Sequence, residues 1–472
     1  MLSRILSALK GAFSGHDEGK EAAERKHFDE LNRQAPIRTS GAPGTAAAST
    51  PVQARPAAAP EIDGFLCRES VLGRDQRVAG YQFMLHEGTR NRIRARGRRI
   101  QHVYAEVLAR NLANVDIGRL LGHRTAFLDV PDSFLDHPSI LDLPARNTAL
   151  VVTAIPEEDG APALVDLLAT TRSLRKAGYR IGLRAEQLDG DRPALLAECD
   201  YIVVRAAASE PEQLKQSMDR LKKAASKAEV IARDLPSQDD FQLCRTLGAA
   251  LFQGPFVTSR QDWHGNRLGP NTARLAQLIS RLRGDADTRE LVDLLKQDAA
   301  LSLRLMRYIN SAAVGSGQEI TSIEGAVLRL GREKLYRWLM LLLYGADKGG
   351  SPRAAAALEN ALVRARLMEL LGENRPAAQR DALYLVGLLS LVDVILEVPM
   401  AEAIASLAPA PEIEAAVLRA EGPMADFLQL AVACENGDPE TLRSAAERCG
   451  IGPEVATRHH LDAFSWALEV NA

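Results

Sequence analysis

Three arginines close short apolar runs in the middle of the chain, and these runs have the form of buried β-strands. They are Arg184, Arg205 and Arg233. Because neighbouring parallel strands bring their carboxyl ends to one edge, the three guanidinium groups would share a pocket that could hold an anion, such as a nucleotide bound without metal. Alternatively, they form ion pairs around the rim of that pocket. The carboxylates available for such pairs are Asp129, Glu186 and Asp234.

A second basic cluster lies between the second predicted strand and the helix after it. It could neutralise the phosphates of a nucleic acid, but no aromatic residue is interleaved to stack on bases, and Gly88 and Gly97 indicate a loop. We therefore expect no nucleic-acid binding and interpret the loop as solvated or as a contact for an acidic protein. The cluster consists of Arg90, Arg92, Arg94, Arg96, Arg98 and Arg99.

The composition argues against several other kinds of site. A formal net charge of -3 over 472 residues gives no overall attraction to nucleic acid or anionic lipid. No apolar run approaches the ~20 residues of a membrane span. The cysteines form no C-x-x-C pair, so we predict neither disulfides nor zinc and expect a reducing cytoplasm. We expect no cofactor. The cysteines are Cys67, Cys199, Cys244, Cys434 and Cys449.

Residues 1–60 do not have the pattern of a domain. Leu2, Ile5, Leu6, Leu9 and Phe13 line one face of a short helix. This helix is either a membrane-surface or partner-docking element or a fraying terminus. Residues 34–60 are rich in Ala, Pro, Ser, Thr and Gly and are predicted to be a disordered linker.

Strands and helices alternate from Gly64 onward. Helical stretches at 98–113, 161–177, 211–226 and 238–247 separate most of the strands. Alternation of this kind predicts a (β/α)8 TIM-like barrel over residues 61–262, with function at the carboxyl ends of the strands. The predicted strands are 64–69, 78–86, 125–130, 149–155, 179–184, 200–205, 228–233 and 249–253.

An all-α bundle is predicted over residues 263–472. In residues 290–309 the apolar side chains recur at helical spacing with one interruption at Gln297-Asp298, which predicts two helices. Thr321-Ser322-Ile323-Glu324 has the form of a capping box that opens the next helix, and Gly331 ends it. Residues 335–343 are so apolar that exposing them would forfeit roughly 2 kcal/mol per large side chain.

This helical half resembles the HDOD domain of bacterial signalling proteins. The resemblance rests on Gln297–Leu305, Ile309–Ala313 and Ile320–Gly331, and it continues through 388–393 to Glu421-Gly422-Pro423. It implies a bundle related to HD phosphohydrolases, whose metals are held by histidines and His-Asp pairs.

The metal ligands of HD enzymes are missing from this half. Ser390-Leu391 stand where an HD enzyme has His-Asp. The histidines of 266–472, His459 and His460, are adjacent in sequence and would point about 100° apart on a helix. We therefore expect no metal here, and we predict that both histidines are surface or interface residues.

The barrel half resembles EAL domains at its two ends, Val78–Leu85 and Leu251–Phe256. EAL enzymes hydrolyse cyclic di-GMP with two divalent metals held by carboxylates and an asparagine. Among the family's ligand positions in this chain, only Asp129 could bind metal. The other positions of the family's site residues fall on Gln82, His86, Thr153, Arg184, Ala185, Val203, Arg233 and Pro236.

Loss of these ligands would strongly disfavour metal binding. A guanidinium at about 5 Å from a divalent ion opposes it by several kcal/mol even at an effective dielectric near 20. The resemblance therefore implies a degenerate barrel in which Gln82, Thr153 and Ala185 are lost metal positions, with no catalytic residue and no metal.

The sequence as a whole predicts a non-catalytic bacterial regulator or scaffold that acts through protein contacts of its HDOD domain. The alternatives are a metal-free nucleotide sensor that uses Arg184, Arg205, Arg233 and Asp129, and, as a third class, an active cyclic di-GMP phosphodiesterase. The stretch Pro411–Glu421 mixes apolar and charged residues. This mixture is typical of a transient protein interface and equally of an ordinary amphipathic helix.

Overall fold

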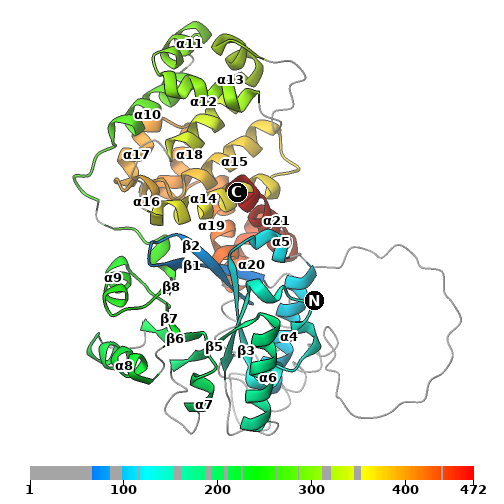
Figure 1. Cartoon of the computed structure of the whole chain (residues 1–472). Helices are drawn as coiled ribbons and strands as arrows, with labels where there is room; N and C mark the ends of the chain where they lie inside the picture. Colours follow the sequence, from blue (N-terminus) through cyan, green and yellow to red (C-terminus); the bar gives the residue numbers. More distant parts are fainter. Residues whose placement is uncertain are drawn as a thin grey trace, which may run out of the picture. The chain divides into compact units, whose positions relative to one another are not determined.

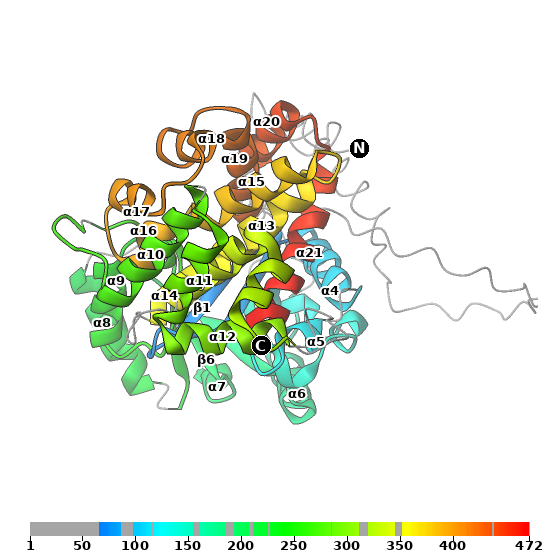
Figure 2. The same cartoon turned by 90° about the horizontal axis from the view of Figure 1, so that it is seen from above.

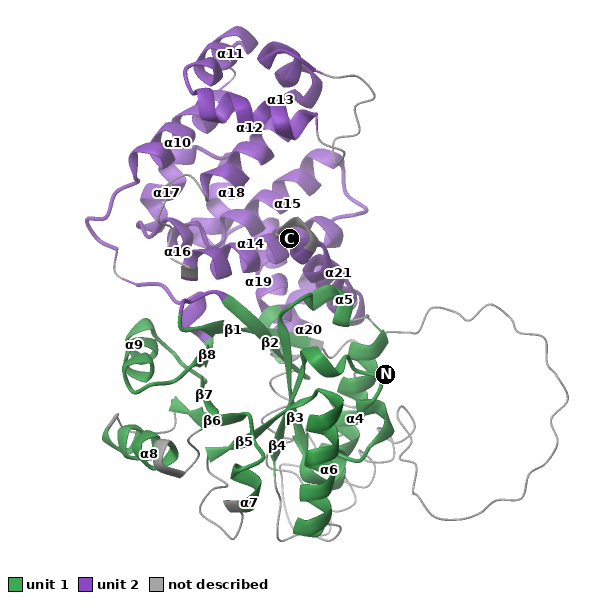
Figure 3. Cartoon of the chain, in the orientation of Figure 1, with its two compact units in different colours: residues 1–74, 78–254, 435–440 green, residues 75–77, 255–434, 441–472 purple. Residues whose placement is uncertain are grey.

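The computed structural model describes most of the chain and divides it into two compact units (Figure 3). The barrel unit contains the described residues up to 254, except 75–77, together with 435–440; the helical unit contains 75–77, 255–434 and 441–471. The predicted helix and linker of residues 1–60 lie outside the described residues. Those are 66–85, 98–114, 117–153, 161–185, 193–206, 211–224, 227–261, 263–284, 286–310, 320–344, 352–436 and 439–471.

Eight strands close into a barrel in sequence order, and each of them overlaps a strand predicted from the sequence. Alternating side chains explain the agreement, because one face of each strand fills the barrel interior. The strands are β1 (Leu66–Gly73), β2 (Val78–Leu85), β3 (Thr125–Pro131), β4 (Thr148–Thr153), β5 (Arg180–Arg184), β6 (Tyr201–Arg205), β7 (Glu229–Arg233) and β8 (Leu251–Gln253).

The first strand departs from a regular (β/α)8 barrel. β1 is antiparallel to both of its neighbours, β2 and β8, whereas the other strands pair in parallel. The connection from Gly73 to Val78 is a short turn, in which the Arg77 amide donates to Asp75 Oδ1 at 3.1 Å. So short a connection permits only antiparallel pairing, because a parallel crossover needs a dozen residues or more.

Helices cover the outside of the barrel in two groups. α4, α5 and α6 gather on one side, and α8 and α9 lie on the opposite side (Figures 1 and 2). Between β3 and β4 the chain forms three short 3-10 turns, η1 (Asp132–Phe134), η2 (Pro138–Ile140) and η3 (Ala145–Asn147). The helices are α4 (Arg98–Asn114), α5 (Ile117–Leu121), α6 (Leu164–Ala177), α7 (Pro193–Leu196), α8 (Pro211–Ala224) and α9 (Gln238–Thr246).

The helical unit is a bundle built around α14, which packs against α15 and α21. The segment between the barrel strands and the bundle includes a 3-10 turn, η6 (Pro255–Val257). The helices are α10 (Pro270–Arg283), α11 (Thr288–Lys296), α12 (Ala299–Ile309), α13 (Ile323–Leu343), α14 (Pro352–Leu371), α15 (Ala377–Leu389), α16 (Val392–Leu396), α17 (Met400–Leu407), α18 (Pro411–Glu414), the π-helix η7 (Ala415–Arg419), α19 (Pro423–Asn436), α20 (Pro439–Cys449) and α21 (Pro453–Asn471).

Small residues allow α14 and α15 to approach closely. Ala361 and Ala365 of α14 are fully buried. Gly387 of α15 lies so near Ala365 that a Cβ built on it would be 2.5 Å from both the Cα and the backbone nitrogen of this alanine. At this point of the bundle the two helices pack backbone to backbone, which leaves no room for a side chain.

The helix boundaries predicted in residues 290–331 are largely confirmed. α11 and α12 separate at Gln297-Asp298, and Asp298 caps α12 by accepting from the Leu301 amide at 3.0 Å. Ser322 caps α13 by accepting from the Gly325 amide at 3.0 Å. Because the residue at that third position is glycine, the second bond of the predicted capping box does not exist. Gly331, at φ 71°, interrupts α13 where the sequence predicts its end.

The cysteines are free thiols, and four of the five are buried. Burial raises the pKa of Cys199 and of Cys244 to about 11, which keeps both thiols protonated at neutral pH. Among the described residues, no helix combines the length and the apolar character needed to cross a membrane.

Candidate functional site

The mouth of the barrel is a layer of polar side chains on top of an apolar interior. The interior is filled by Val71, Phe127, Ala149, Val151, Tyr201, Val203, Ile231 and Leu251. The side chain two residues after each of these interior residues faces the inside of the barrel again, because side chains alternate along a strand. Arg184 also faces the inside, because it pairs in register with the interior residue Val203. The mouth layer therefore contains Gln82, Asp129, Thr153, Arg184, Arg205, Arg233 and Gln253.

Asp129 joins two of the three arginines. Its Oδ2 accepts from Arg184 Nη2 at 2.8 Å, and its Oδ1 accepts from Arg233 Nη1 at 2.7 Å. Arg233 is only 3% exposed. One carboxylate therefore faces two guanidinium groups, and this cluster of three side chains has an excess charge of +1.

Arg205 forms a separate ion pair. Its Nε donates to Asp234 Oδ2 at 2.8 Å. Asp234 directly follows β7 and has a φ of 59°, a left-handed conformation that aspartate tolerates better than most residues. The rim pairing considered from the sequence is therefore present for Arg184, Arg205 and Arg233, whereas Glu186 lies outside the described residues.

Several polar atoms of the mouth layer have no hydrogen-bond partner within the described part of the chain. They belong to side chains that are buried or nearly so, and buried polar atoms usually have a partner. The arginine atoms donate, while each glutamine presents at least one free acceptor. The atoms are Nε of Arg184, Nε and Nη2 of Arg233, Oε1 of Gln82, and Nε2 and Oε1 of Gln253.

The described residues of the mouth do not fit a divalent metal ion. Both oxygens of Asp129 are bound to arginines, and Gln82, Thr153 and Ala185 offer no carboxylate. Within the described ranges, no three His, Cys, Asp or Glu side chains form a group that could hold a metal. No metal-dependent step is therefore derived from this geometry.

The predicted arginine loop is described only at its end. Arg98 opens α4, is 3% exposed, and binds Asp132 through two hydrogen bonds of 2.9 and 3.3 Å. The ion pair that Arg98 forms with Asp132 joins α4 to η1, so this arginine is not available to phosphates or to a partner protein. Arg90, Arg92, Arg94 and Arg96 lie outside the described residues.

Sequence reasoning missed a cluster of titratable side chains around the buried Glu106, between α4 and the segment that follows β3. His102 Nδ1 lies 3.3 Å from Ser133 Oγ, and His137 Nε2 lies 3.9 Å from the carboxylate of Glu106, which is 0% exposed. Burial lowers the pKa of both histidines, with the neighbouring His102 and then Arg110 also lowering that of His137, and burial raises the pKa of Glu106. The i, i+4 spacing of His102 and Glu106 on α4 is a signal that could have found this cluster.

We expect the barrel unit to lose stability as the pH falls from 7.5 to 5.5. A histidine whose folded pKa is lowered contributes stability that is present above its unfolded pKa of about 6.5 and is lost as the pH falls through the folded pKa. The raised pKa of Glu106 acts in the opposite sense, because its contribution is present at low pH and is lost as the pH rises. Urea denaturation of the barrel unit at a series of pH values measures the net effect.

The matched variant for this pH dependence is His102→Gln combined with His137→Gln, which removes both titrating imidazoles. Its urea midpoint should change less between pH 7.5 and 5.5 than that of the unchanged protein. An identical slope in both proteins would show that other groups cause the pH dependence.

In the helical unit, arginines surround the position of the HD motif. Ser390 Oγ donates to the Gly387 carbonyl at 2.7 Å and lies 3.2 Å from Arg364 Nη1. Asp393 is 1% exposed and accepts from Arg260 Nε at 2.6 Å. The predicted surface position of His460 is wrong, because it is 2% exposed within α21; His459 lies 3.7 Å from Asp462.

Comparison with known proteins agrees with both halves of this architecture. Residues 270–421 match the HDOD domain family. The two segments that resemble EAL domains form β2 and β8 of the closed barrel. The cyclic di-GMP phosphodiesterase CdgJ of Vibrio cholerae is 20% identical over 411 residues, which cover 86% of this chain and 93% of CdgJ. Residues 270–421 are therefore an HDOD domain, and the barrel that precedes it resembles EAL domains.

Two further proteins are similar to this chain. The uncharacterized protein YuxH of Bacillus subtilis is 21% identical over 416 residues, which cover 85% of this chain and 97% of YuxH. Among solved structures, YkuI of Bacillus subtilis, an EAL-domain protein in complex with cyclic di-GMP and calcium, has a TM-score of 0.33 and 15% identity, with coverage of 58% of this chain and 73% of that chain.

The prediction that the chain is not an enzyme is contradicted by one of these relatives. CdgJ aligns over nearly its whole length and is a phosphodiesterase. The prediction rested on the family's aligned ligand positions. The segments that follow β4 and β5, which lie outside the described residues, contain further carboxylates, namely Glu157, Glu158, Asp159, Glu186 and Asp189.

Proposed function

We propose that the barrel mouth binds cyclic di-GMP and that its arginines receive the phosphodiester groups of this nucleotide. The observation that carries the proposal is Arg233, a buried arginine whose Nε and Nη2 have no partner among the described residues. Arg184 beside it has a free Nε. Charge-assisted hydrogen bonds from a planar guanidinium suit a phosphate oxygen well. The choice of nucleotide comes from the name of CdgJ.

On binding, a phosphate of the nucleotide would replace the Asp129 carboxylate as the anion that the arginines contact. The side chain of Arg205 is 39% exposed and that of Arg184 is 13% exposed, so an entering phosphate meets these two before Arg233, whose side chain is 4% exposed. Asp129 then competes with the phosphate for the same two guanidinium groups. Its carboxylate keeps the arginines paired in the free protein, and its displacement would couple ligand binding to the ends of β3, β5 and β7.

Hydrolysis of cyclic di-GMP is the second candidate function, and the phosphodiesterase activity in the name of CdgJ favours it. The residues described here would contribute by binding the charged phosphodiester and by orienting it over the barrel mouth. Arg184 and Arg233 would also stabilise the negative charge that develops on the phosphate oxygens during hydrolysis.

For the signalling output we propose a protein partner that binds the helical unit. Support comes from Pro411–Glu421, which forms a surface segment with half-buried Val417 and Leu418 and with exposed Glu412, Arg419 and Glu421. A small apolar centre within a charged rim is typical of transient interfaces.

Isothermal titration of the full chain with cyclic di-GMP tests the nucleotide proposal. We expect Arg184→Met and Arg205→Met to weaken binding about tenfold each, as expected for loss of a charge-assisted contact. Asp129→Asn should strengthen binding because the competing charge is removed. Arg172→Met, an exposed arginine of α6 paired with Glu198, is the control and should change nothing.

Two outcomes would contradict the nucleotide proposal: no heat of binding at millimolar nucleotide, or equal affinity of all four variants. Chromatography of the same samples with added Mg²⁺ or Mn²⁺ detects the linear dinucleotide and so tests hydrolysis separately.

A further inference from the structure

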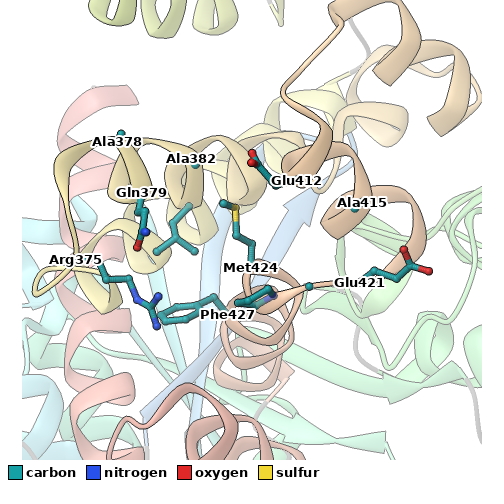
Figure 4. Close-up of a pocket in the computed structure, with 12 residues that line it drawn as sticks. Arg375, Ala378, Gln379, Ala382, Glu412, Ala415, Glu421, Met424 and Phe427 are labelled. Atoms are coloured by element: carbon teal, nitrogen blue, oxygen red, sulfur yellow. The ribbon is translucent and has the colours of Figure 1, made fainter.

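A cavity of about 700 Å³ opens on the helical unit between α15, α18, η7 and the start of α19 (Figure 4). One apolar part of its lining consists of the buried Leu383 and Phe427 and the half-buried Met424. Ala382 and Ala415 add small side chains that leave the space open. An apolar hollow of this volume is in the range that accepts a ligand or one or two large side chains of a partner.

The two ends of the cavity carry opposite charges. Arg375 lies at one end, with its guanidinium 4.8 Å from the centre of the Phe427 ring, and Glu412 and Glu421 lie toward the other end (Figure 4). Arg419 binds Glu421 at 3.1 Å and Glu414 at 3.4 Å. Glu412 has no ion pair with any residue that the structure describes. Three carboxylates and one arginine thus leave a net negative charge at this end.

The backbone around the acidic end is unusual. η7 is a single π-helical turn, and such turns occur frequently at functional sites. Ala420 follows it with a φ of 55°, and Gly422 has a φ of 84°. An alanine rarely adopts this conformation, so the surrounding structure must hold it there. The result is a tight turn that places Glu421 at the edge of the cavity (Figure 4).

We propose that this cavity docks a segment of a partner protein in which a large apolar side chain is followed or preceded by a lysine or arginine. The apolar side chain fills the space over Leu383, Met424 and Phe427, and the basic residue pairs with Glu412 and Glu421. This proposal rests on the partner contact proposed above and names its site and its chemistry. Charge complementarity selects the occupant, because an acidic segment would meet the unpaired carboxylate of Glu412 at the open end.

The test uses a library of random twelve-residue peptides displayed on phage and panned against the immobilised full chain. Enriched peptides should share a large apolar residue within about four positions of a lysine or arginine, as expected if both reach one small site. Synthetic peptides of that sequence are then titrated against purified variants by fluorescence anisotropy.

The variants separate the two halves of the site. Ala382→Phe fills the cavity and should weaken binding at least tenfold, and Glu412→Lys should weaken it about fivefold or more. Glu402→Lys, an exposed glutamate of α17 outside the cavity, makes the same charge change and should have no effect. Glu412 is also exposed, so a folding defect cannot account for its effect if the thermal midpoint is unchanged.

The docking proposal is overturned if panning enriches no sequence, if it enriches acidic peptides, or if the enriched peptides bind Ala382→Phe and Glu412→Lys as tightly as the unchanged chain. Arg184→Met should bind the peptides normally. Failure of cyclic di-GMP binding at the barrel and failure of peptide binding at the bundle are therefore distinguishable.

Discussion

Replacing Gly387 with alanine should lower the free energy of unfolding of the helical unit by about 2 to 3 kcal/mol, which is typical of overpacking in a core. The added methyl group would lie 2.5 Å from two backbone atoms of Ala365. Backbone atoms within a helix cannot move aside as the end of a flexible side chain can, so α14 and α15 must separate. Urea denaturation followed by circular dichroism measures the loss.

Gly284→Ala is the matched control for this substitution. A Cβ at Gly284 would be 3.4 Å from its nearest neighbour, and the residue has an ordinary negative φ of -79°. We expect a change within about 0.5 kcal/mol. If Gly387→Ala were equally mild, the close approach of α14 and α15 would not be a real constraint on the bundle.

The second large effect is expected at the barrel mouth, where Asp129→Ala should destabilise the barrel unit by about 3 kcal/mol. Removing one partner of a buried ion pair leaves an uncompensated charge, which costs about 3 to 5 kcal/mol when burial is complete. Arg233 is almost fully buried, but the side chain of Asp129 is 23% exposed, so we take the lower end of this range. Thermal and urea denaturation of the barrel unit measure the change.

A double substitution shows whether charge is the cause. Adding Arg233→Met to Asp129→Ala removes the orphaned guanidinium and replaces it with an apolar side chain, so most of the lost stability should return. If the double variant is less stable than Asp129→Ala alone, packing of the Arg233 side chain contributes more to stability than its pairing with Asp129.

The sequence was sufficient to place the strands and to locate the arginines at the barrel mouth. Apolar runs of strand length are strong local signals, and residues at the ends of neighbouring strands meet for reasons of topology alone. Antiparallel β1 could also have been predicted, because the few residues between Gly73 and Val78 cannot form a crossover. That Asp129 binds both Arg184 and Arg233 depends on distances across the barrel, which no local sequence pattern contains.

In the helical unit the sequence predicted the positions of helices better than the side-chain contacts between them. The π-helical turn at Ala415–Arg419 arises from a change in the spacing of the backbone hydrogen bonds, and this change does not alter the pattern of apolar residues in the sequence. Burial of His460 depends on how α21 packs against α14. The buried arginines of α14, Arg353 and Arg364, bind backbone and side-chain oxygens of distant segments, and periodicity alone does not predict such partners.

The short β8 determines where the barrel wall has the fewest paired residues, because it pairs with β7 only at Ile231 opposite Leu251 and Ala232 opposite Phe252. β1 is held to β2 along almost its whole length, from Leu66 opposite Leu85 to Leu72 opposite Val78. It meets β8 only at Val71, Leu72 and Gly73. The barrel therefore closes through β8, a three-residue strand that is antiparallel to β1 and parallel to β7. Local opening at β8 would withdraw Gln253 from the mouth layer while β2 to β7 keep their ladder, so the proposed nucleotide site would loosen without unfolding of the barrel.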